Sequence, residues 1–411
     1  MSGITIKPFK AVRPKPELAH AVASLPYDVM NTQEARMIVA DNPNSFLHVD
    51  RAEIDLSEDI DPYSPEVYAK AKENLASLTE NAMLQDSKPN LYVYRLTSYG
   101  HTQTGLVTCV STAESEQIKK HEFTRPDKEQ DRINHMLACA AHTSPVLLAY
   151  RTKDSTQPTI IISEFIQKQS PVYDFTAEDG VRHEVWVVSN TETQDALIQS
   201  FAKIPNIYIA DGHHRNAAAL KVAIERNKRY HNPEAEHNFY LAVIFPDTDL
   251  EILDYNRVVK DLNGMTPLVF LESLNESWQV EATTSQVKPT KKHVVGMYLK
   301  GQWYKLTLKN QLFSRDIIET LDCTILQNHL LAPLLGISDP RIDKRIDFVG
   351  GIRGLEELEI RVDSGEMTVA FALYPTSMQE LIAVTDANQV MPPKSTWFEP
   401  KLRSGLFVHL F

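Results

Sequence analysis

Long apolar segments are missing from this 411-residue sequence, and no run approaches the roughly 20 residues of a membrane span. The first eight residues, Met1 to Pro8, lack the uninterrupted apolar stretch of a signal peptide. There are only three cysteines, Cys109, Cys139 and Cys323, which are far apart and lack the spacing of metal ligands. We therefore expect buried, reduced thiols and a cytoplasmic location.

Positive charge is also in short supply. The chain has 42 Lys and Arg residues against 54 Asp and Glu residues, which gives a net charge of −12. Such a surface repels nucleic acid, so we expect neither a nucleic-acid partner nor a membrane partner. Any site for an anion has to be built locally from the few cations available.

The remaining composition is that of an ordinary globular protein, with 43% apolar and 23% charged residues. At 411 residues the chain is too long for one ordinary hydrophobic core, which indicates two or three domains. No internal repeat or low-complexity tract is visible.

The most informative stretch runs from Ile207 to Leu220. It opens with a short apolar run, 207–210, of the length and β-branching of a buried strand, and it continues as an alanine-rich helix former. Between the two lie Asp211, which is placed to cap the helix, and Gly212, which permits a tight turn or the close approach of a ligand.

Three cationic or titratable side chains, His213, His214 and Arg215, stand in the first turn of this predicted helix. A helix N-terminus already presents N–H groups and a partial positive charge, so cations are poorly placed there for stability. This local conflict is best explained by a bound phosphate or another anion. The alternative is a solvated polar loop without a ligand.

His121-Glu122 forms a second cluster, with Thr124 and Arg125 behind it. A zinc protease would need a second histidine four residues after the first, and that position holds Arg125. Glu122 remains a candidate general base beside a cationic neighbour. Structural ion pairing is the alternative.

A basic, proline-rich loop follows near the end of the acidic chain, from Met391 to Gly405. Its Lys394-Ser395-Thr396 segment is similar to the end of a phosphate-binding P-loop, but the glycine-rich loop and the preceding strand are missing. We predict that this loop, with Lys394 and Lys401, docks onto the central site. A plain surface turn is the alternative.

Hydrophobic periodicity predicts a chain that mixes helices and strands. The expected helices are 32–39, 65–80, 127–141, 193–203, 267–274, 322–335 and 378–386. The expected strands are 91–96, 103–110, 146–150, 159–166, 183–188, 207–210, 238–245, 252–259, 293–299, 303–308 and 368–374, with one more after the turn at Asn42, ending at Val49.

The stretch Asp211-Gly212-His213-His214-Arg215, preceded by an apolar strand, resembles the signature of the DUF1015 family. Further blocks agree with that family, and they span nearly the whole chain: 25–29, 42–49, His121-Glu122 with Asp131-Arg132, and 391–396 to 404–406. One departure is Asn256, where family members are expected to carry a histidine before Arg257.

The central signature is also similar to the phosphate-binding turn of the ParB/sulfiredoxin-like fold, in which free-serine kinases are the nearest members. That resemblance implies an α/β, mixed α+β protein with a ParB/sulfiredoxin-like nucleotide-binding core at 86–262. Residues 1–85 would form an N-terminal extension that packs on this core. Residues 263–411 would form a C-terminal α+β domain carrying the basic loop.

Two activities of this superfamily are disfavoured by the residues. Sulfiredoxin chemistry needs a cysteine where this chain has His213. DNA partitioning of the ParB type does not fit the acidic charge of the chain or its lack of an evident helix-turn-helix.

The resemblance then implies a nucleotide-dependent phosphotransferase, of kinase type, or a nucleotide hydrolase. ATP or ADP would be the phosphoryl donor, Mg²⁺ the metal, and a small hydroxylated metabolite, such as free serine, the acceptor. The alternative is a regulatory protein that binds a nucleotide without turnover.

The residues expected to act fall into two groups. Those expected to take part in catalysis are Asp211, His213, His214 and Glu122, with Asp211 as a possible Mg²⁺ ligand. Those expected to bind the nucleotide or its phosphates are Gly212, His213, His214, Arg215, Lys394, Ser395, Thr396 and Lys401.

Overall fold

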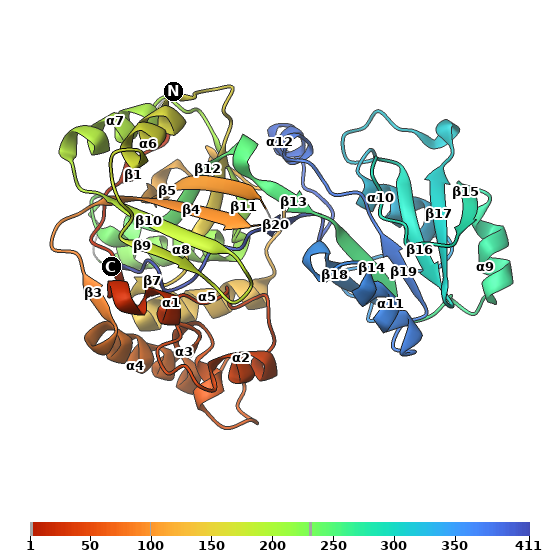
Figure 1. The fold of residues 1–411 in the computed structure, drawn as a ribbon, viewed down its shortest axis with the longest axis horizontal. Helices are drawn as coiled ribbons and strands as arrows, with labels where there is room; N and C mark the ends of the chain where they lie inside the picture. Colours follow the sequence, from red (N-terminus) through yellow and green to blue (C-terminus); the bar gives the residue numbers. More distant parts are fainter. Residues whose placement is uncertain (1–2, 99, 230–231) are drawn as a thin grey trace. The chain divides into compact units, whose positions relative to one another are not determined.

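The computed structural model describes residues 3–98, 100–229 and 232–411 (Figure 1). The chain forms two compact units. Unit 1 contains residues 1–120, 124–250 and 400–411, and unit 2 contains residues 121–123 and 251–399. The division into three domains expected from the sequence stays a prediction.

Unit 1 is built on a nine-stranded mixed sheet. The order of its strands is β6 (Ile118–Lys119), β11 (Ile207–Asp211), β8 (Val146–Tyr150), β12 (Phe239–Pro246), β5 (His101–Ser111), β4 (Leu91–Ser98), β10 (Arg182–Val188) and β9 (Tyr173–Thr176), with β1 (Ile6–Lys7) paired to β5. β11 runs parallel to β6, and β12 runs parallel to β8, while the other pairs are antiparallel. The predicted mixed α/β class is confirmed, and the ParB/sulfiredoxin-like core stays a prediction.

Four helices contribute apolar residues to the same core as this sheet. They are α5 (Pro126–Cys139), α6 (Gln157–Ile166), α7 (Thr191–Phe201) and α8 (His213–Arg229). The neighbouring strands β8 and β12 are buried along their whole length, so the polar end of β11 at Asp211 stands out as partly accessible. The turn formed by Asp211–Arg215, called the DGHHR turn below, lies at this edge of the core.

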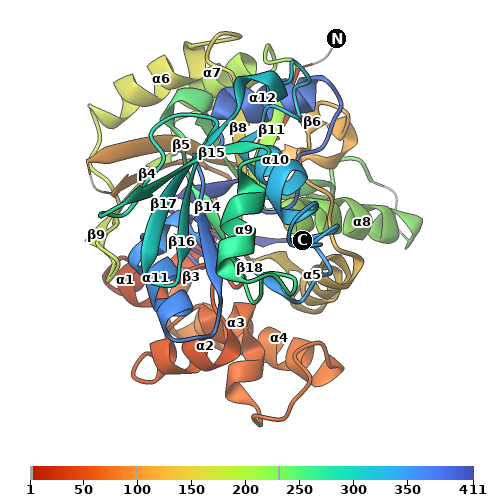
Figure 2. The ribbon, with the colours of Figure 1, turned by 90° about the vertical axis from the view of Figure 1, so that its right-hand side faces the viewer.

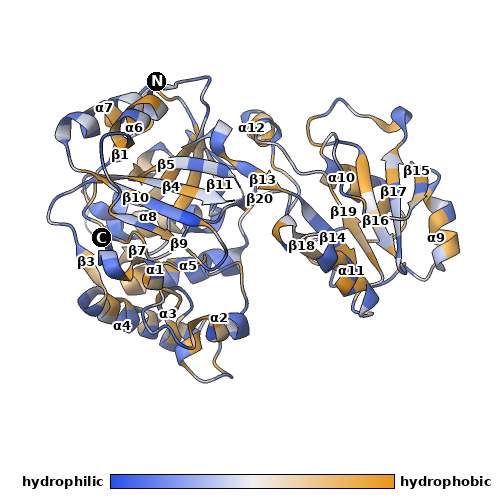
Figure 3. Ribbon diagram, in the orientation of Figure 1, coloured by the Kyte–Doolittle hydropathy of each residue, from blue (hydrophilic) through white to orange (hydrophobic). Residues whose placement is uncertain are grey.

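The N-terminal part of unit 1 packs a second, smaller core. Its helices are α1 (Ala19–Val22), α2 (Thr32–Val39), α3 (Leu47–Asp50) and α4 (Pro65–Asn81), and β2 (Val12–Pro14) pairs with β3 (Met83–Gln85). Figures 1 and 2 both show α2, α3 and α4 at one end of this unit and α6 and α7 at the other. In Figure 3, α4 carries hydrophobic and hydrophilic residues on different sides, because its apolar residues are spaced three and four apart.

The last twelve residues return to unit 1. Phe407 is fully buried, and its ring packs against the rings of Tyr92 and Tyr94 in β4. Val408 joins the N-terminal core, and β21 (His409–Leu410) pairs with β7 (Ala141–His142). This segment is therefore an internal part of the unit.

Unit 2 contains a six-stranded antiparallel sheet in the order β15 (Trp278–Thr283), β17 (Gln302–Leu308), β16 (Val294–Leu299), β19 (Val369–Ala372), β14 (Tyr255–Val259) and β18 (Ile346–Gly350). Leu358 and Val362 of α11 (Glu356–Asp363) pack into the core beside this sheet. A separate two-stranded ribbon joins β13 (Glu251–Leu253) to β20 (Trp397–Glu399). Helices α9 (Pro267–Leu274), α10 (Asp322–Leu326) and α12 (Met378–Asp386) complete the unit.

Several predicted elements were wrong. Residues 159–166, predicted as a strand, lie in helix α6, and Val49, predicted to end a strand, lies in helix α3. The single strand predicted at 252–259 is two strands, β13 and β14, in different sheets. The helix predicted at 322–335 is short, since α10 passes into a π-helical turn, η7 (Gln327–Leu331).

Two expectations from composition can be compared with the structure. Among the described helices, none has both the length and the apolar character needed to span a bilayer. All three cysteines are buried, as predicted, and none forms a disulfide.

Candidate functional site

The DGHHR turn joins a buried strand directly to a helix. β11 ends at Asp211 and α8 begins at His213, so Gly212 alone makes the connection. The N–H of Asn216 donates to the carbonyl of Gly212 at 2.9 Å, which makes Gly212 the residue that accepts the first helical hydrogen bond. The predicted capping role of Asp211 is therefore corrected: Gly212 occupies the N-cap position, and Asp211 precedes it.

Gly212 is required here by its backbone and by its surroundings. Its φ is +95°, a conformation that residues with a Cβ rarely adopt. A Cβ at this position would lie 3.0 Å from Nε of Arg215 and 3.1 Å from Nη2 of the same guanidinium. The guanidinium of Arg215 is thus folded back over the turn.

Arg215 is a buried cation, with 4% of its surface exposed. Its Nη1 donates to the carbonyl of Pro145, and its Nη2 lies 3.8 Å from Oδ1 of Asp211. Its Nε has no hydrogen-bond partner among the described residues. Leaving a buried charged donor without a partner costs stability, so a ligand that offers an acceptor to this N–H would stabilise the turn.

Asp211 is the counterion of this site. Its Oδ1 accepts from the N–H of Gly212 at 2.8 Å, and its Oδ2 lies 3.3 Å from Nζ of Lys401. Burial raises the pKa of Asp211, but the positive charges of Lys401 and Arg215 outweigh that effect and hold the pKa well below its usual range. Asp211 is therefore an ionised carboxylate at neutral pH, suited to orient a hydroxyl group or to hold a cation rather than to take a proton.

The two histidines differ in their surroundings. His213 is buried, with 7% of its surface exposed. His214 is half-buried, and its Nε2 accepts a hydrogen bond of 3.0 Å from the backbone N–H of Arg125, just before α5. In this arrangement Nε2 of His214 is an acceptor, so this nitrogen does not donate to a phosphate oxygen.

The structure brings Lys401 to the turn, and it places Lys394, Ser395 and Thr396 of the basic loop in unit 2. The Lys394 ammonium lies over the ring of Tyr255 at 5.6 Å, and the Lys394 carbonyl accepts from Nη2 of Arg257. Ser395 is buried, donates to the carbonyl of Pro392 at 2.6 Å, and lies 3.2 Å from Sγ of Cys323. These contacts give Ser395 a structural role within unit 2.

Glu122 and the histidine before it also belong to unit 2. Nε2 of His121 lies 3.2 Å from Oγ1 of Thr396, and the His121 carbonyl accepts from the N–H of Met391. The basic loop thus docks against His121, next to Glu122. The predicted roles of Glu122, Lys394, Ser395 and Thr396 at the DGHHR turn stay predictions.

Asn256, where a histidine was expected, is fully buried in β14. Its Nδ2 donates to Oδ2 of Asp254 at 2.5 Å, and its Oδ1 accepts from the N–H of Leu373 at 2.9 Å. Both ends of the amide are occupied, so the side chain ties β14 to the residue after β19.

A small pocket brings Arg215 together with residues to which the sequence analysis assigned no role. It is lined by Tyr27, Arg132, His135, Met136, Thr143, Ser144 and Arg215, all of unit 1. Several of these fall in sequence blocks that agree with the DUF1015 family, such as 25–29 and Asp131-Arg132. That agreement was the one signal in the sequence that could have grouped them.

Comparison with known families identifies the chain. The profile of DUF1015, described as a protein of unknown function, matches residues 6–324, so the chain belongs to the DUF1015 family. No curated protein matches the chain.

Solved structures show only distant likeness. A conserved hypothetical protein from Pyrococcus furiosus has a TM-score of 0.37 at 15% identity, with 74% of this chain and 95% of that chain covered. Free serine kinase in complex with AMP has a TM-score of 0.36 at 13% identity, with 73% and 91% covered. SbnI from Staphylococcus aureus, with a C-terminal truncation, has a TM-score of 0.40 at 12% identity, with 74% and 87% covered. Likenesses this low carry no conclusion about the function of this chain.

Proposed function

We propose that this protein is a nucleotide-dependent phosphotransferase that acts on a small hydroxylated metabolite. The observation that carries the proposal is the concentration of cations at the N-terminus of α8 in an otherwise acidic chain. Arg215 and Lys401 are both largely buried there, beside Asp211 and the first-turn N–H groups. Such a helix end favours phosphate oxygens.

Phosphoryl transfer asks little covalent chemistry of a protein. It needs the phosphates to be neutralised and the acceptor hydroxyl to be positioned in line with them. In this proposal Arg215 and Lys401 hold phosphate oxygens, and His213 and His214 contribute further donors. Asp211 orients the hydroxyl group of the acceptor.

The residues at the turn fit a nucleotide phosphate, because the buried Nε of Arg215 has no acceptor among the described residues. They also fit Mg²⁺ in a limited way. Asp211 offers one carboxylate, and Mg²⁺ is commonly held by one or two carboxylates together with water and phosphate oxygens. When bound, Mg²⁺ would neutralise phosphate charge.

The proposal is tested by nucleotide binding to the full-length protein. ATP should raise the melting temperature, because a ligand of the folded state stabilises it. Lys401→Gln should weaken ATP binding by about tenfold or more, which is the scale of one charge-assisted hydrogen bond. Lys228→Gln is the matched control, since Lys228 is an exposed cation of the same unit whose ion pair is with Glu225. Equal ATP affinity in the parent and Lys401→Gln would refute the phosphate site.

A second measurement separates an enzyme from a nucleotide-binding regulator. Consumption of ATP is followed with Mg²⁺ and a panel of hydroxylated metabolites that includes L-serine, the acceptor implied by the family resemblance. Asp211→Asn keeps the shape of the side chain but removes its charge. In an enzyme it should lower turnover by about a hundredfold while ATP still binds. ATP binding without turnover in the parent would instead identify a regulator.

A further inference from the structure

We propose that the pocket beside Arg215 binds the carboxylate group of the phosphoryl acceptor, which makes the acceptor a small hydroxy acid. The existence of an anion pocket stands on its own geometry, and the assignment of its ligand as the acceptor rests on the proposed function. Two buried arginines line this pocket, one from α5 and one from α8.

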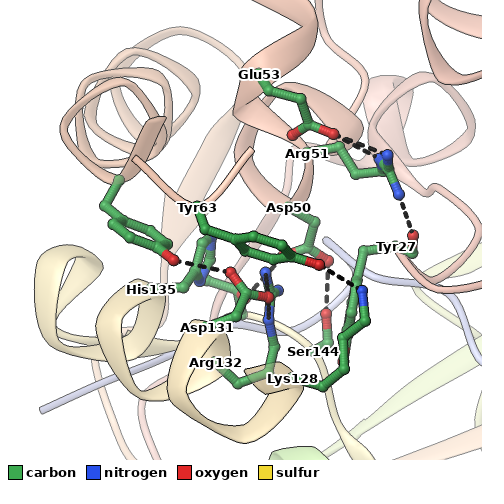
Figure 4. Close-up of polar contacts among 12 residues, drawn as sticks. Tyr27, Asp50, Arg51, Glu53, Tyr63, Lys128, Asp131, Arg132, His135 and Ser144 are labelled. Carbon is green, nitrogen blue, oxygen red and sulfur yellow. Dashed lines mark hydrogen bonds and ion pairs between the residues drawn. The ribbon is translucent and has the colours of Figure 1, made fainter. Parts of the chain in front are cut away.

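Arg132 is the first of these arginines, and its known contacts occupy only part of its guanidinium. Its Nε and Nη2 contact Oδ2 of Asp131 at 2.9 Å and 2.7 Å, and its guanidinium lies over the ring of Tyr27 at 4.0 Å. Figure 4 shows Arg132 held among these side chains. Among the described residues its contacts use Nε and Nη2, so Nη1 remains for an acceptor.

Arg215 is the second arginine, and it connects the pocket to the DGHHR turn. Its guanidinium lines the pocket on one side and approaches Asp211 on the other. A molecule whose carboxylate lies between Arg132 and Arg215 would therefore have its other end close to the proposed phosphate site. That is the arrangement a phosphoryl acceptor requires.

Two acidic groups around the pocket, Asp131 and Asp50, are already engaged. Asp131 is paired with Arg132 and accepts from the hydroxyl of Tyr68 at 3.1 Å. Asp50 accepts from Oγ1 of Thr143 at 2.8 Å and from Oγ of Ser144 at 2.6 Å, as Figure 4 shows for Ser144. Because both carboxylates are held by donors, they position the walls of the pocket rather than fill it.

The size and chemistry of the pocket fit one small terminal group, such as a carboxylate, with the rest of the ligand outside. Its cavity volume of about 10 Å³ leaves room for about one water-sized group and not for a nucleotide. The planar fork of an arginine matches a carboxylate. Nε2 of His135 lies 2.9 Å from the carbonyl of Val49, which makes it the N–H donor; burial, then Arg132, lowers the pKa of His135. Its neutral Nδ1 can therefore accept from a hydroxyl or ammonium group of the ligand.

The test measures dissociation constants by calorimetry for three pairs of probes that differ in the carboxylate: glycolate and ethylene glycol, D-glycerate and glycerol, L-serine and ethanolamine. At least one acid should bind the full-length protein, and its partner without a carboxylate should bind at least about tenfold more weakly. Absence of binding by all three acids, or equal binding within the pairs, overturns the proposal.

Two variants locate the binding. The double variant Asp131→Asn/Arg132→Gln removes the positive charge without leaving Asp131 as an unpaired buried carboxylate, and it should weaken acid binding about tenfold or more while ATP binding is retained. Arg132→Lys, which keeps the charge but not the fork, should give an intermediate loss and serves if the double variant does not fold. Arg182→Gln is the control, since Arg182 is an exposed arginine of unit 1 paired with Asp174.

The outcomes distinguish the two proposals. Absence of ATP binding in the parent refutes the proposed phosphotransferase but not the anion pocket. Acid binding that is unchanged in the Arg132 variants refutes the pocket while the phosphate site stands.

Discussion

Gly212 excludes any side chain for two independent reasons, its positive φ and the guanidinium of Arg215 packed over it. A glycine at a strand-to-helix turn could be inferred from the sequence. The close approach of the Arg215 side chain to Gly212 could not be inferred, because it depends on the hydrogen bond that the guanidinium donates to the carbonyl of Pro145. The same local motif thus predicted the turn but not how its arginine is held.

Gly212→Ala should destabilise unit 1 and disturb the site at the same time. The positive φ alone costs an alanine about 1 kcal/mol, and the Cβ must displace the Arg215 guanidinium. Chemical denaturation should show a loss of at least about 1 kcal/mol, and ATP binding should weaken. Gly180→Ala is the control, because Gly180 has a similar φ of +79° but nothing near its Cβ position. A smaller effect at Gly212 than at Gly180 would contradict the packing argument.

Helices and strands were predicted correctly where the residues of the segment itself determine its structure. The strands at 91–96 and 103–110 and the helix at 65–80 were predicted correctly, because their signals, short runs of strand-forming residues and helical spacing, are local features of the sequence. Helix α6 was predicted as a strand because Ile160, Ile161 and Ile162 favour strands locally. Pro158 in its first turn was the helix signal that should have outweighed them.

In the candidate site, too, local features could be predicted from the sequence and long-range contacts could not. The DGHHR turn is local, so its strand, glycine and helix could be predicted from residues 207–220. Lys401 is 190 positions from Asp211, and Ser144 is 94 positions from Asp50, so their contacts depend on the tertiary fold. The hydrophobic periodicity of the sequence could not show that these distant residues would come into contact.

The pairing of β7 with β21 places two buried histidine rings together. His142 and His409 stack with centroids 5.7 Å apart, and Nε2 of His142 has no hydrogen-bond partner among the described residues. Burial, and then His409, hold the pKa of His142 well below its usual value. The unfolded chain therefore binds a proton more readily than the folded chain, so unit 1 should lose stability as the pH falls below about 6.5.

His142→Phe keeps an aromatic ring at this position and removes the imidazole that takes up the proton. Its unfolding free energy should depend less steeply on pH between about 4 and 6.5 than that of the parent. Fluorescence of Trp186, the tryptophan of unit 1, reports the transition. Identical pH profiles in the two proteins would contradict the assignment to His142.

Asp322, at the start of α10 in unit 2, makes stability depend on pH in the opposite direction. Burial raises the pKa of Asp322 to about 7, with Glu380 adding to the rise, although the N–H of His293 donates to Oδ1 at 2.7 Å. The folded chain then binds the proton more readily, so stability falls as the pH rises from about 4 through 7. Its slope cannot exceed about 1.4 kcal/mol per pH unit for one proton.

Asp322→Asn should remove this slope and make unit 2 more stable at pH 8, since the amide oxygen can still accept from His293. Unfolding of unit 2 can be followed by its three tryptophans, Trp278, Trp303 and Trp397, in a Trp186→Phe background. A variant that is less stable than its parent at pH 8 would show that Asp322 stays charged in the folded protein.

In the order of the chain, residues 251–399 of unit 2 are inserted between two segments of unit 1. The two ends of this insertion lie next to each other. Glu251 and Glu399 are directly paired across the ribbon of β13 and β20. The chain ends that an excision would create are therefore already adjacent. Residues 400–411, in contrast, supply Phe407 and Val408 to the interior of unit 1.

A chain with residues 252–398 replaced by an Asn-Gly turn should fold as unit 1 alone, because that dipeptide closes a two-stranded ribbon. A chain that instead lacks residues 400–411 should not reach the native fold, because it leaves Tyr92, Tyr94 and Val12 uncovered. Thermal unfolding monitored at Trp186 distinguishes the two. Cooperative unfolding of the truncated chain at the parent's temperature would contradict the role assigned to the returning segment.

The return of residues 400–411 sets an order for folding during synthesis. The ribosome delivers residues 251–399 before the segment that completes unit 1, so unit 2 can form while unit 1 still lacks part of its interior. Until that segment emerges, the nascent chain exposes the apolar faces that Phe407 and Val408 later cover. Unit 1 is thus the earlier unit in sequence and the later one to mature, and its uncovered apolar faces favour aggregation during that interval.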